Sequence, residues 1–309
     1  MSLEVEGNDG KILQWGDGIP CPKCRSVNWP HHGLFVSHFE SGSSRCRRCE
    51  EPFDLWQEAL YSLKNWPVSW FAFRLLGAVI NRFEVELEAN KTVPVEFTEI
   101  PEGAEIVNVK VMTLGPHDGP AVLPALPLHG EIHWDPFPRL LRLYGMAHGN
   151  AAPASKVWIA VTWIPPEHEL SVHHLVAAAK QFVAGRFSAV IIPANVAVEA
   201  ALTPAMDQWI RTYCDPDETR EFLSLKGATF AHQLKVLTKV GARALGIQEI
   251  PSPILVHLTR LLQYRNDLGH KGTLNHPKRK PPDRDRAADF LVAATFGYHY
   301  ARYFQDAVK

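Results

Sequence analysis

The chain has 309 residues, enough for two or three domains, and its hydrophobic share of 46% and charged share of 21% are ordinary for a protein with packed cores. The net charge of -1 excludes a protein that attracts nucleic acid by its overall charge, so any nucleic-acid site must be a local basic patch. Residues 1–11 lack the apolar segment of a secretory signal, and the longest apolar run, Ala189–Leu202, is shorter than the ~20 residues of a membrane span. We therefore expect a cytoplasmic protein without a membrane partner.

Residues 1–18 are expected to form a flexible lead, and two cysteine pairs follow it. Four of the five cysteines form C-x2-C pairs: Cys21 with Cys24, and Cys46 with Cys49. Each pair fits a tight turn that directs two thiolates at one ion, and two such turns complete a tetrahedral Zn²⁺ site. The spacing predicts a small β zinc ribbon over 19–56. Its closed four-thiolate site would hold a structural Zn²⁺ rather than a catalytic one.

Arginines surround these cysteines: Arg25, Arg45, Arg47 and Arg48. They could contact phosphates of a nucleic acid. They could equally offset the negative charge of four thiolates while remaining solvated. The sequence leaves both interpretations open.

Residues 57–168 are predicted to form a β-rich or α/β middle domain of unknown role. Trp56–Asn65 has helical character, and Val68–Asn81 fits either a helix or a strand. Phe83, Val85 and Leu87 alternate with glutamates, which is the pattern of a half-buried strand. Further strands are predicted at Val93–Phe97, Ile106–Leu114 and Val157–Trp163.

One alternating set in this region has metal-ligating residue types: His129, Glu131, His133 and Asp135. On a regular strand these side chains would share one face. Prolines at 124, 127 and 136 favour a solvated loop or edge strand instead. No chemistry is assigned to this region.

From residue 169 to 309 the apolar spacing becomes helical. Helices are predicted at His174–Phe182, Ala194–Cys214, Phe230–Leu245, Ile254–Leu268 and Arg284–Asp306. The predicted fold class is therefore a multidomain α+β protein that ends in an all-α helical bundle.

The segment around Arg265, Asn266 and His270 is the most informative in the chain. Asn266 and His270 are four residues apart and would share one helix face. Arg265 and His270 are five apart and would diverge by about 140° on a regular helix. Gly269 predicts a break there, which would let His270 swing toward Arg265.

Arg265-Asn266-x3-His270 resembles the R-x4-H motif of HEPN domains, and the trailing Lys271-Gly272 is also typical of them. The upstream segment Ala177–Leu202 resembles the first two helices of that family. The resemblance covers residues 170–305. It implies a metal-independent endoribonuclease that cleaves RNA by attack of the ribose 2′-OH, a chemistry that the family often uses in toxin or defence settings. It also implies a homodimer through the C-terminal bundle, in which two motifs share a cleft.

The residue types suit this chemistry. Histidine titrates near neutral pH, so His270 could act as general acid or base, and Arg265 could hold two phosphate oxygens of the transition state. Asn266 could orient the imidazole or the phosphate. A basic stretch could track the RNA backbone: Lys271, Lys278, Arg279 and Lys280.

A second hypothesis uses the same residues without catalysis. Arg265 could pair with Asp267 or Glu199, His270 could interact with the helix C-terminus, where a cation is favoured, and the basic stretch could be a solvated loop. The chain would then be a non-catalytic nucleic-acid- or protein-binding adaptor, or a structural subunit of a larger complex.

Overall fold

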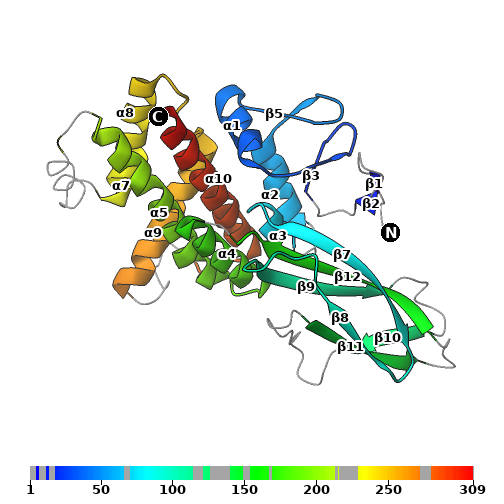
Figure 1. The fold of residues 1–309 in the computed structure, drawn as a ribbon. Helices are drawn as coiled ribbons and strands as arrows, with labels where there is room; N and C mark the ends of the chain where they lie inside the picture. The colour runs from blue at the N-terminus through cyan, green and yellow to red at the C-terminus, as the bar shows by residue number, and fades with distance from the viewer. Residues whose placement is uncertain are drawn as a thin grey trace. The chain divides into compact units, whose positions relative to one another are not determined.

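The computed structural model describes residues 5–6, 12–13, 18–65, 70–113, 121–125, 140–148, 154–166, 169–212, 215, 229–271 and 280–308. The chain divides into two compact units, and Figure 1 traces both along the chain. The first unit combines Met1–Gly77 with His168–Lys309, and the second is Ala78–Glu167. The structure is mixed α/β, with small antiparallel sheets and a C-terminal cluster of helices.

The N-terminal part of the first unit consists of three short antiparallel strand pairs and three helices. The strands are β1 (Val5–Glu6), β2 (Ile12–Leu13), β3 (Ile19–Pro20), β4 (Val27–Asn28), β5 (Ser44–Arg45) and β6 (Pro52–Phe53), paired in that order. The helices are α1 (His32–Ser41), α2 (Leu55–Asn65) and α3 (Phe71–Arg74). Gly42 ends α1 at a φ of 73°, where glycine is favoured, and its N–H donates to the carbonyl of His38.

The C-terminal part of the first unit is helical. It contains α4 (Leu170–Val183), η1 (Phe187–Val190), α5 (Ile191–Ile210), α7 (Phe230–His232), η3 (Gln233–Leu237), α8 (Thr238–Leu245), α9 (Ser252–Lys271) and α10 (Arg284–Val308). Every residue from Ala287 to Ala301 is buried, so α10 is the central helix of this unit. A Cβ on Gly297 would lie 3.1 Å from Val198 and 3.2 Å from Leu258, because α5, α9 and α10 approach closely there.

One core joins the four-cysteine segment to the helices. The Phe296 ring of α10 is in contact with Phe35 and Phe39 of α1 and with Trp56 of α2. The prediction of separate domains at 19–56 and 169–309 therefore differs from the structure, which places both in one compact unit. A segment as short as 19–56 buries little apolar surface alone, and α10 supplies the missing partner.

The second unit is β-rich, as predicted, but it begins at Ala78 rather than residue 57. Its strands are β7 (Val79–Glu88), β8 (Thr92–Glu96), β9 (Glu105–Thr113), β10 (Ala121–Ala125), β11 (Leu140–His148) and β12 (Ala154–Ile164). They form two antiparallel sheets, ordered β7-β12-β9 and β10-β11-β8. Glu84, Glu86 and Glu88 of β7 are exposed while Leu87 is fully buried, which follows the predicted alternation.

The helix predicted at Ala194–Cys214 begins and ends earlier in the structure, and the helix predicted at Ile254–Leu268 is longer than predicted. Phe187–Ile210, 24 residues, is long and apolar enough by composition to cross a membrane, although 50% of its apolar window is buried. Its main part, α5, packs against α4, α9 and α10, as the core helix of a bundle does. Helix α9 continues through Gly269 to Lys271, so the predicted break at Gly269 is wrong. The alternating set at 129–135 and the lone Cys214 lie outside the described residues.

Candidate metal centre and helix-end site

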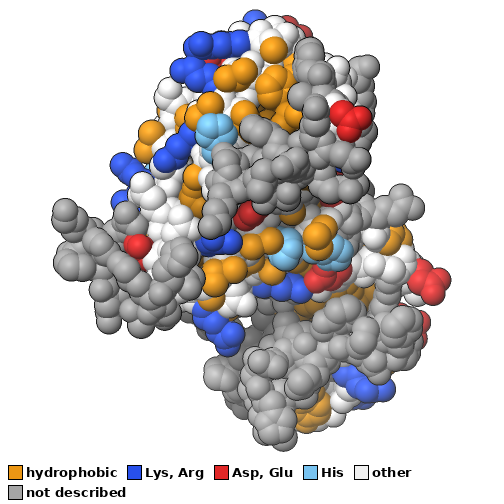
Figure 2. Space-filling view, turned by 90° about the vertical axis from the view of Figure 1, so that its left-hand side faces the viewer, with side chains coloured by type: hydrophobic (Ala, Val, Ile, Leu, Met, Phe, Trp, Pro, Cys, Tyr) orange, Lys and Arg blue, Asp and Glu red, His pale blue; other side chains and the backbone are white. Residues whose placement is uncertain are grey.

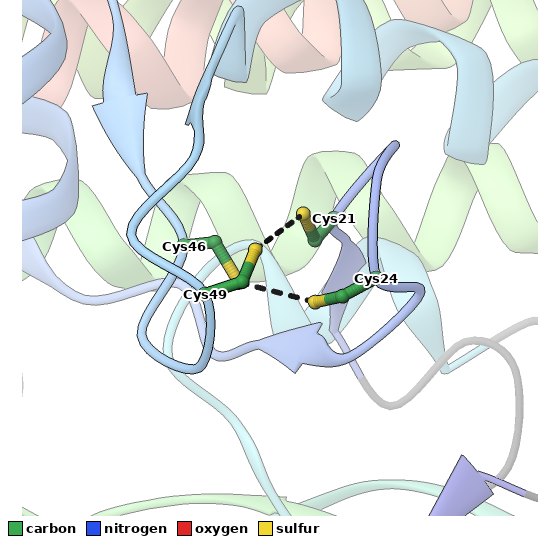
Figure 3. A group of neighbouring side chains, drawn as sticks. All are labelled: Cys21, Cys24, Cys46 and Cys49. Carbon is green, nitrogen blue, oxygen red and sulfur yellow. Dashed lines mark hydrogen bonds between the residues drawn. The ribbon is translucent and has the colours of Figure 1, made fainter.

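The four paired cysteines converge on one point. Their sulfur atoms all lie within 4.8 Å of one another, which fits a metal ion (Figure 3). The Sγ atoms of Cys21 and Cys49 are 3.7 Å apart, and those of Cys24 and Cys46 are 3.6 Å apart. These distances are far too long for a disulfide, whose sulfurs are ~2.05 Å apart. They match the edges of a tetrahedron with arms of ~2.3 Å, which are about 3.8 Å.

Two similar turns present the thiols. In the first, the N–H of Arg25 donates to the carbonyl of Cys21 at 3.0 Å; in the second, the N–H of Glu50 donates to the carbonyl of Cys46 at 2.9 Å. Arg25 and Glu50 each follow the second cysteine of their pair, with φ values of 62° and 58°. A side chain is disfavoured at such a φ, so closure of the two turns is stabilised by the rest of the site.

The surroundings of the sulfurs shift the pKa values of the thiols in opposite directions. Burial raises the pKa of the Cys46 thiol, but hydrogen bonds from the Ser26 hydroxyl and from the N–H groups of Cys49 and Arg48 outweigh it and lower that pKa to about 6. Burial raises the pKa of Cys21 to about 12. Crowded thiols cannot all deprotonate without a compensating cation, and a metal ion held by the four sulfurs would supply that charge.

The arginines near the cysteines are all exposed: Arg25, Arg45, Arg47 and Arg48. The guanidinium of Arg45 donates to the carbonyl of Glu50 at 3.3 Å. The N–H of Arg47 donates to the Asn28 side chain at 2.9 Å, which links the second turn to β4. On the face shown in Figure 2, the described lysines and arginines lie at several separate places rather than in one basic patch.

Arg265 and Asn266 are neighbours on the last turns of α9. Both side chains are partly buried, and Nη1 of Arg265 donates to Oδ1 of Asn266 at 3.3 Å. Among the described residues, no carboxylate forms an ion pair with Arg265, so the structure shows neither predicted pairing, with Asp267 or with Glu199.

The continuous helix fixes where His270 lies on α9. It is one turn after Asn266, so these two positions share a face, while Arg265 lies about 140° around the helix from His270. The two ends of the predicted motif are therefore not brought together within one α9.

Only part of the predicted basic stretch is described. The backbone of Lys271 ends α9, and Lys278 and Arg279 lie outside the described residues. Lys280 is exposed, and its carbonyl accepts a hydrogen bond from the Tyr264 hydroxyl at 3.2 Å.

Comparison of the chain with protein-family models, curated proteins and solved structures finds no match. The resemblance to HEPN domains therefore remains a prediction that depends on residues 170–305 alone.

A polar cluster that the sequence interpretation missed lies where α2, α9 and α10 meet. The buried carboxylate of Asp289 is 2.6 Å from Nζ of Lys64, 3.4 Å from Nη1 of Arg286 and 3.7 Å from Nδ1 of His257. Trp56 packs against the His257 ring, with ring centroids 5.4 Å apart. A signal was present in the sequence, because Asp289 interrupts the long apolar run of the last helix and must find a partner when buried.

Proposed function

We propose that the chain is a zinc-containing endoribonuclease of HEPN type, with Arg265, Asn266 and His270 as its catalytic residues. The observation that carries the proposal is the state of Arg265. Its guanidinium is partly buried at a helix end and, within the described residues, bonds only to the neutral Asn266. A guanidinium has five N–H donors, so enough remain to hold two oxygens of a phosphate.

The proposed reaction is a transesterification within the RNA. A base removes the proton of a ribose 2′-OH, the oxygen attacks the adjacent phosphorus, and the bond to the 5′-oxygen of the next nucleotide breaks. An acid protonates that leaving oxygen, giving a 2′,3′-cyclic phosphate and a 5′-hydroxyl. Arg265 would stabilise the extra charge of the pentacoordinate state.

One His270 per chain cannot supply acid and base together, and on α9 it lies far around the helix from Arg265. We therefore propose a C2 homodimer through the C-terminal bundle, in which Arg265 of one copy approaches His270 of the other. Light scattering at micromolar concentration should give the mass of two chains. A monomer that cleaves RNA would contradict this arrangement.

The metal in this proposal is structural Zn²⁺ held by Cys21, Cys24, Cys46 and Cys49. Four thiolate ligands suit Zn²⁺ and leave no open coordination position for substrate or water. The two similar turns and sulfur separations of 3.6 and 3.7 Å support a zinc ribbon. Zinc would fix α1 against α10 and take no part in the cleavage.

A non-catalytic adaptor is the second candidate function. The observation that favours it is the continuous α9, because a lone chain with Arg265 and His270 on different faces can bind RNA or protein but has no assembled catalytic site. The two candidates differ in one measurable property, which is cleavage.

The test is cleavage of a labelled single-stranded RNA in EDTA by wild type and His270→Ala, with His173→Ala of α4 as the matched control, since His173 is exposed. We expect wild type and His173→Ala to cleave and His270→Ala to be inactive. Arg265→Lys should lose ~10²–10³ in rate, because an ammonium cannot reproduce the bidentate contact. Absence of cleavage by every protein would favour the adaptor.

A further inference from the structure

We infer that a strip of side chains at the junction of α2, α9 and α10 binds single-stranded RNA, with Lys64, Arg260 and Arg286 contacting phosphates and Tyr61 stacking on a base. We call it the α2–α9–α10 strip. The inference rests on the proposed function, since it names the surface that would hold the substrate. The strip is separate from the basic stretch at 271–280, and it includes α2 from the N-terminal part of the first unit.

The strip has more positive charge than its internal ion pairs need. One buried carboxylate, Asp289, pairs with both Lys64 at 2.6 Å and Arg286 at 3.4 Å, so its single negative charge offsets only one of the two cations. Arg260 is exposed and, among the described residues, forms no ion pair. The exposed Asp283 and Asp285 lie at the start of α10 beside Arg286. Two of the three cations share the Asp289 carboxylate and Arg260 pairs with no described carboxylate, so the cluster around Asp289 carries excess positive charge. Such an excess attracts the phosphates of a nucleic acid.

The three cations surround a single imidazole. Burial lowers the pKa of His257, the Asp289 carboxylate opposes this, and Arg260, Arg286 and Lys64 each lower the pKa further. His257 is therefore neutral at neutral pH and adds no positive charge to the strip. Asp289 holds two of the cations in place, so these side chains lose little conformational freedom when a phosphate binds.

An exposed aromatic ring lies on the same helix as one of these cations, Lys64. Tyr61 is 57% exposed and precedes Lys64 by three residues on α2, which makes the two side chains neighbours on one helix face. Rings interleaved with cations are how proteins hold single-stranded nucleic acid with little sequence preference. The exposed ring of Tyr61 favours single-stranded nucleic acid as the ligand over a free phosphate ion, because only the former has bases that can stack on it.

The strip lies close to the proposed catalytic end of α9. Arg260 precedes Arg265 by five residues, or about 7.5 Å along the helix axis. Helices α9 and α10 are held together at this level by Tyr264 and Phe290, whose ring centroids are 5.1 Å apart. Arg260 and Arg265 also lie about 140° apart around α9, so a strand bound on the strip would have to pass around the helix to reach Arg265.

The experiment measures binding of a fluorescein-labelled, fully 2′-O-methylated oligonucleotide, which keeps the charge and bases of RNA but lacks the 2′-OH nucleophile. The full-length variants are Arg260→Gln and Tyr61→Leu. The matched control is Arg243→Gln, because Arg243 is also exposed but lies on α8 and pairs with Glu249 at 2.7 Å. Circular dichroism melting checks that each variant is folded.

We expect Tyr61→Leu to weaken binding about tenfold through loss of stacking, with Arg243→Gln within about twofold of wild type. For Arg260→Gln, we expect the slope of log affinity against log salt to fall by about 1. Wild type that does not bind the oligonucleotide at low salt would overturn the inference. So would variants that bind the oligonucleotide like the control. A Tyr61→Leu that loses as much affinity for duplex DNA as for the oligonucleotide would also overturn it, because the bases of a duplex are not free to stack on the ring.

This result is separable from the proposed function. Weakened binding in Arg260→Gln and Tyr61→Leu, with no cleavage of ordinary RNA by wild type, would support the strip and reject the ribonuclease. Cleavage by wild type with binding unaffected in both variants would reject the strip and keep the ribonuclease.

Discussion

The four-cysteine site and the end of α9 are two regions of one compact unit, and they differ in how their groups are brought together. The cysteines converge because two short turns, each closed by its own backbone hydrogen bond, aim two sulfurs apiece at one point. On α9, Arg265 and His270 lie about 140° apart, so no local turn can join them. The comparison teaches that the ligands of a candidate metal site can converge within one chain, while the proposed catalytic pair would need a second copy.

The largest expected effect is at the metal site. Cys46→Ser should lose the metal and lower stability strongly, since apparent zinc binding energies of ~10–16 kcal/mol are coupled to folding in such sites. Because α1 shares the Phe296 contact with α10, the melting temperature of the whole first unit should fall. Elemental analysis and thermal unfolding are the measurements.

Cys214→Ser is the matched control, because it makes the same change at the cysteine outside the pairs. It should retain one Zn²⁺ per chain. Freshly purified wild type without bound metal would contradict the account of this region.

The next effect concerns the polar cluster around Asp289, where α2, α9 and α10 meet. Asp289→Asn leaves Lys64 and Arg286 without their buried carboxylate. Because both cations are partly exposed, the loss should be smaller than for a fully buried pair, about 1–3 kcal/mol. The measurement is the free energy of unfolding in urea. Asp207→Asn, which breaks the more exposed pair with Arg211, should lose no more than ~0.5 kcal/mol. Equal losses in the two variants would show that Asp289 does not hold the junction together.

A smaller effect depends on pH at the contact of α1 with α10. Burial lowers the pKa of His299 well below 6.5, and His32, Arg302 and His31 lower it further. The unfolded chain therefore binds this proton more readily, so the stabilisation is present above pH ~6.5 and is lost as pH falls, by up to ~1.4 kcal/mol per unit. His299 stacks on Phe35 at 3.8 Å between ring centroids.

His299→Phe keeps this stacking and removes the titration. We expect its unfolding free energy to fall less than that of wild type between about pH 6.5 and pH 5, as measured by urea denaturation. His38 and His257, whose pKa values are also lowered first by burial, should leave a residual slope in the variant. The same slope in both proteins would show that His299 does not titrate on unfolding.

The smallest effect tests the cysteine turns themselves. Arg25→Gly should raise the melting temperature slightly. The positive φ of 62° disfavours a side chain by ~1–2 kcal/mol, and glycine removes this penalty. Part of the gain is offset because glycine also increases the conformational entropy of the unfolded chain. Arg47→Gly, at an exposed position of the second turn without a positive φ, should not stabilise the protein. If Arg25→Gly lowers the melting temperature instead, the Arg25 side chain stabilises the fold by more than its positive φ destabilises it.

The sequence predicted what depends on neighbours along the chain. The C-x2-C spacing located the four sulfurs, and the alternation around Val85 and Leu87 located β7. It did not predict that α9 passes through Gly269, because a single glycine in a helix costs only about 1 kcal/mol and packing overrides it. Nor did it predict the contact of His32 with His299, whose Nδ1 atoms are 3.2 Å apart across 267 positions of sequence.

The most direct test of the ribonuclease claim uses two labelled RNA strands that differ at one atom. The second strand carries a single 2′-deoxyribose at the main cleavage position of the first, and both are incubated with wild-type protein in EDTA. The account predicts cleavage of the first strand to a 2′,3′-cyclic phosphate and a 5′-hydroxyl, and loss of that cut alone in the second. Cleavage of both strands at that position would contradict it, because the nucleophile would then not be the ribose 2′-OH.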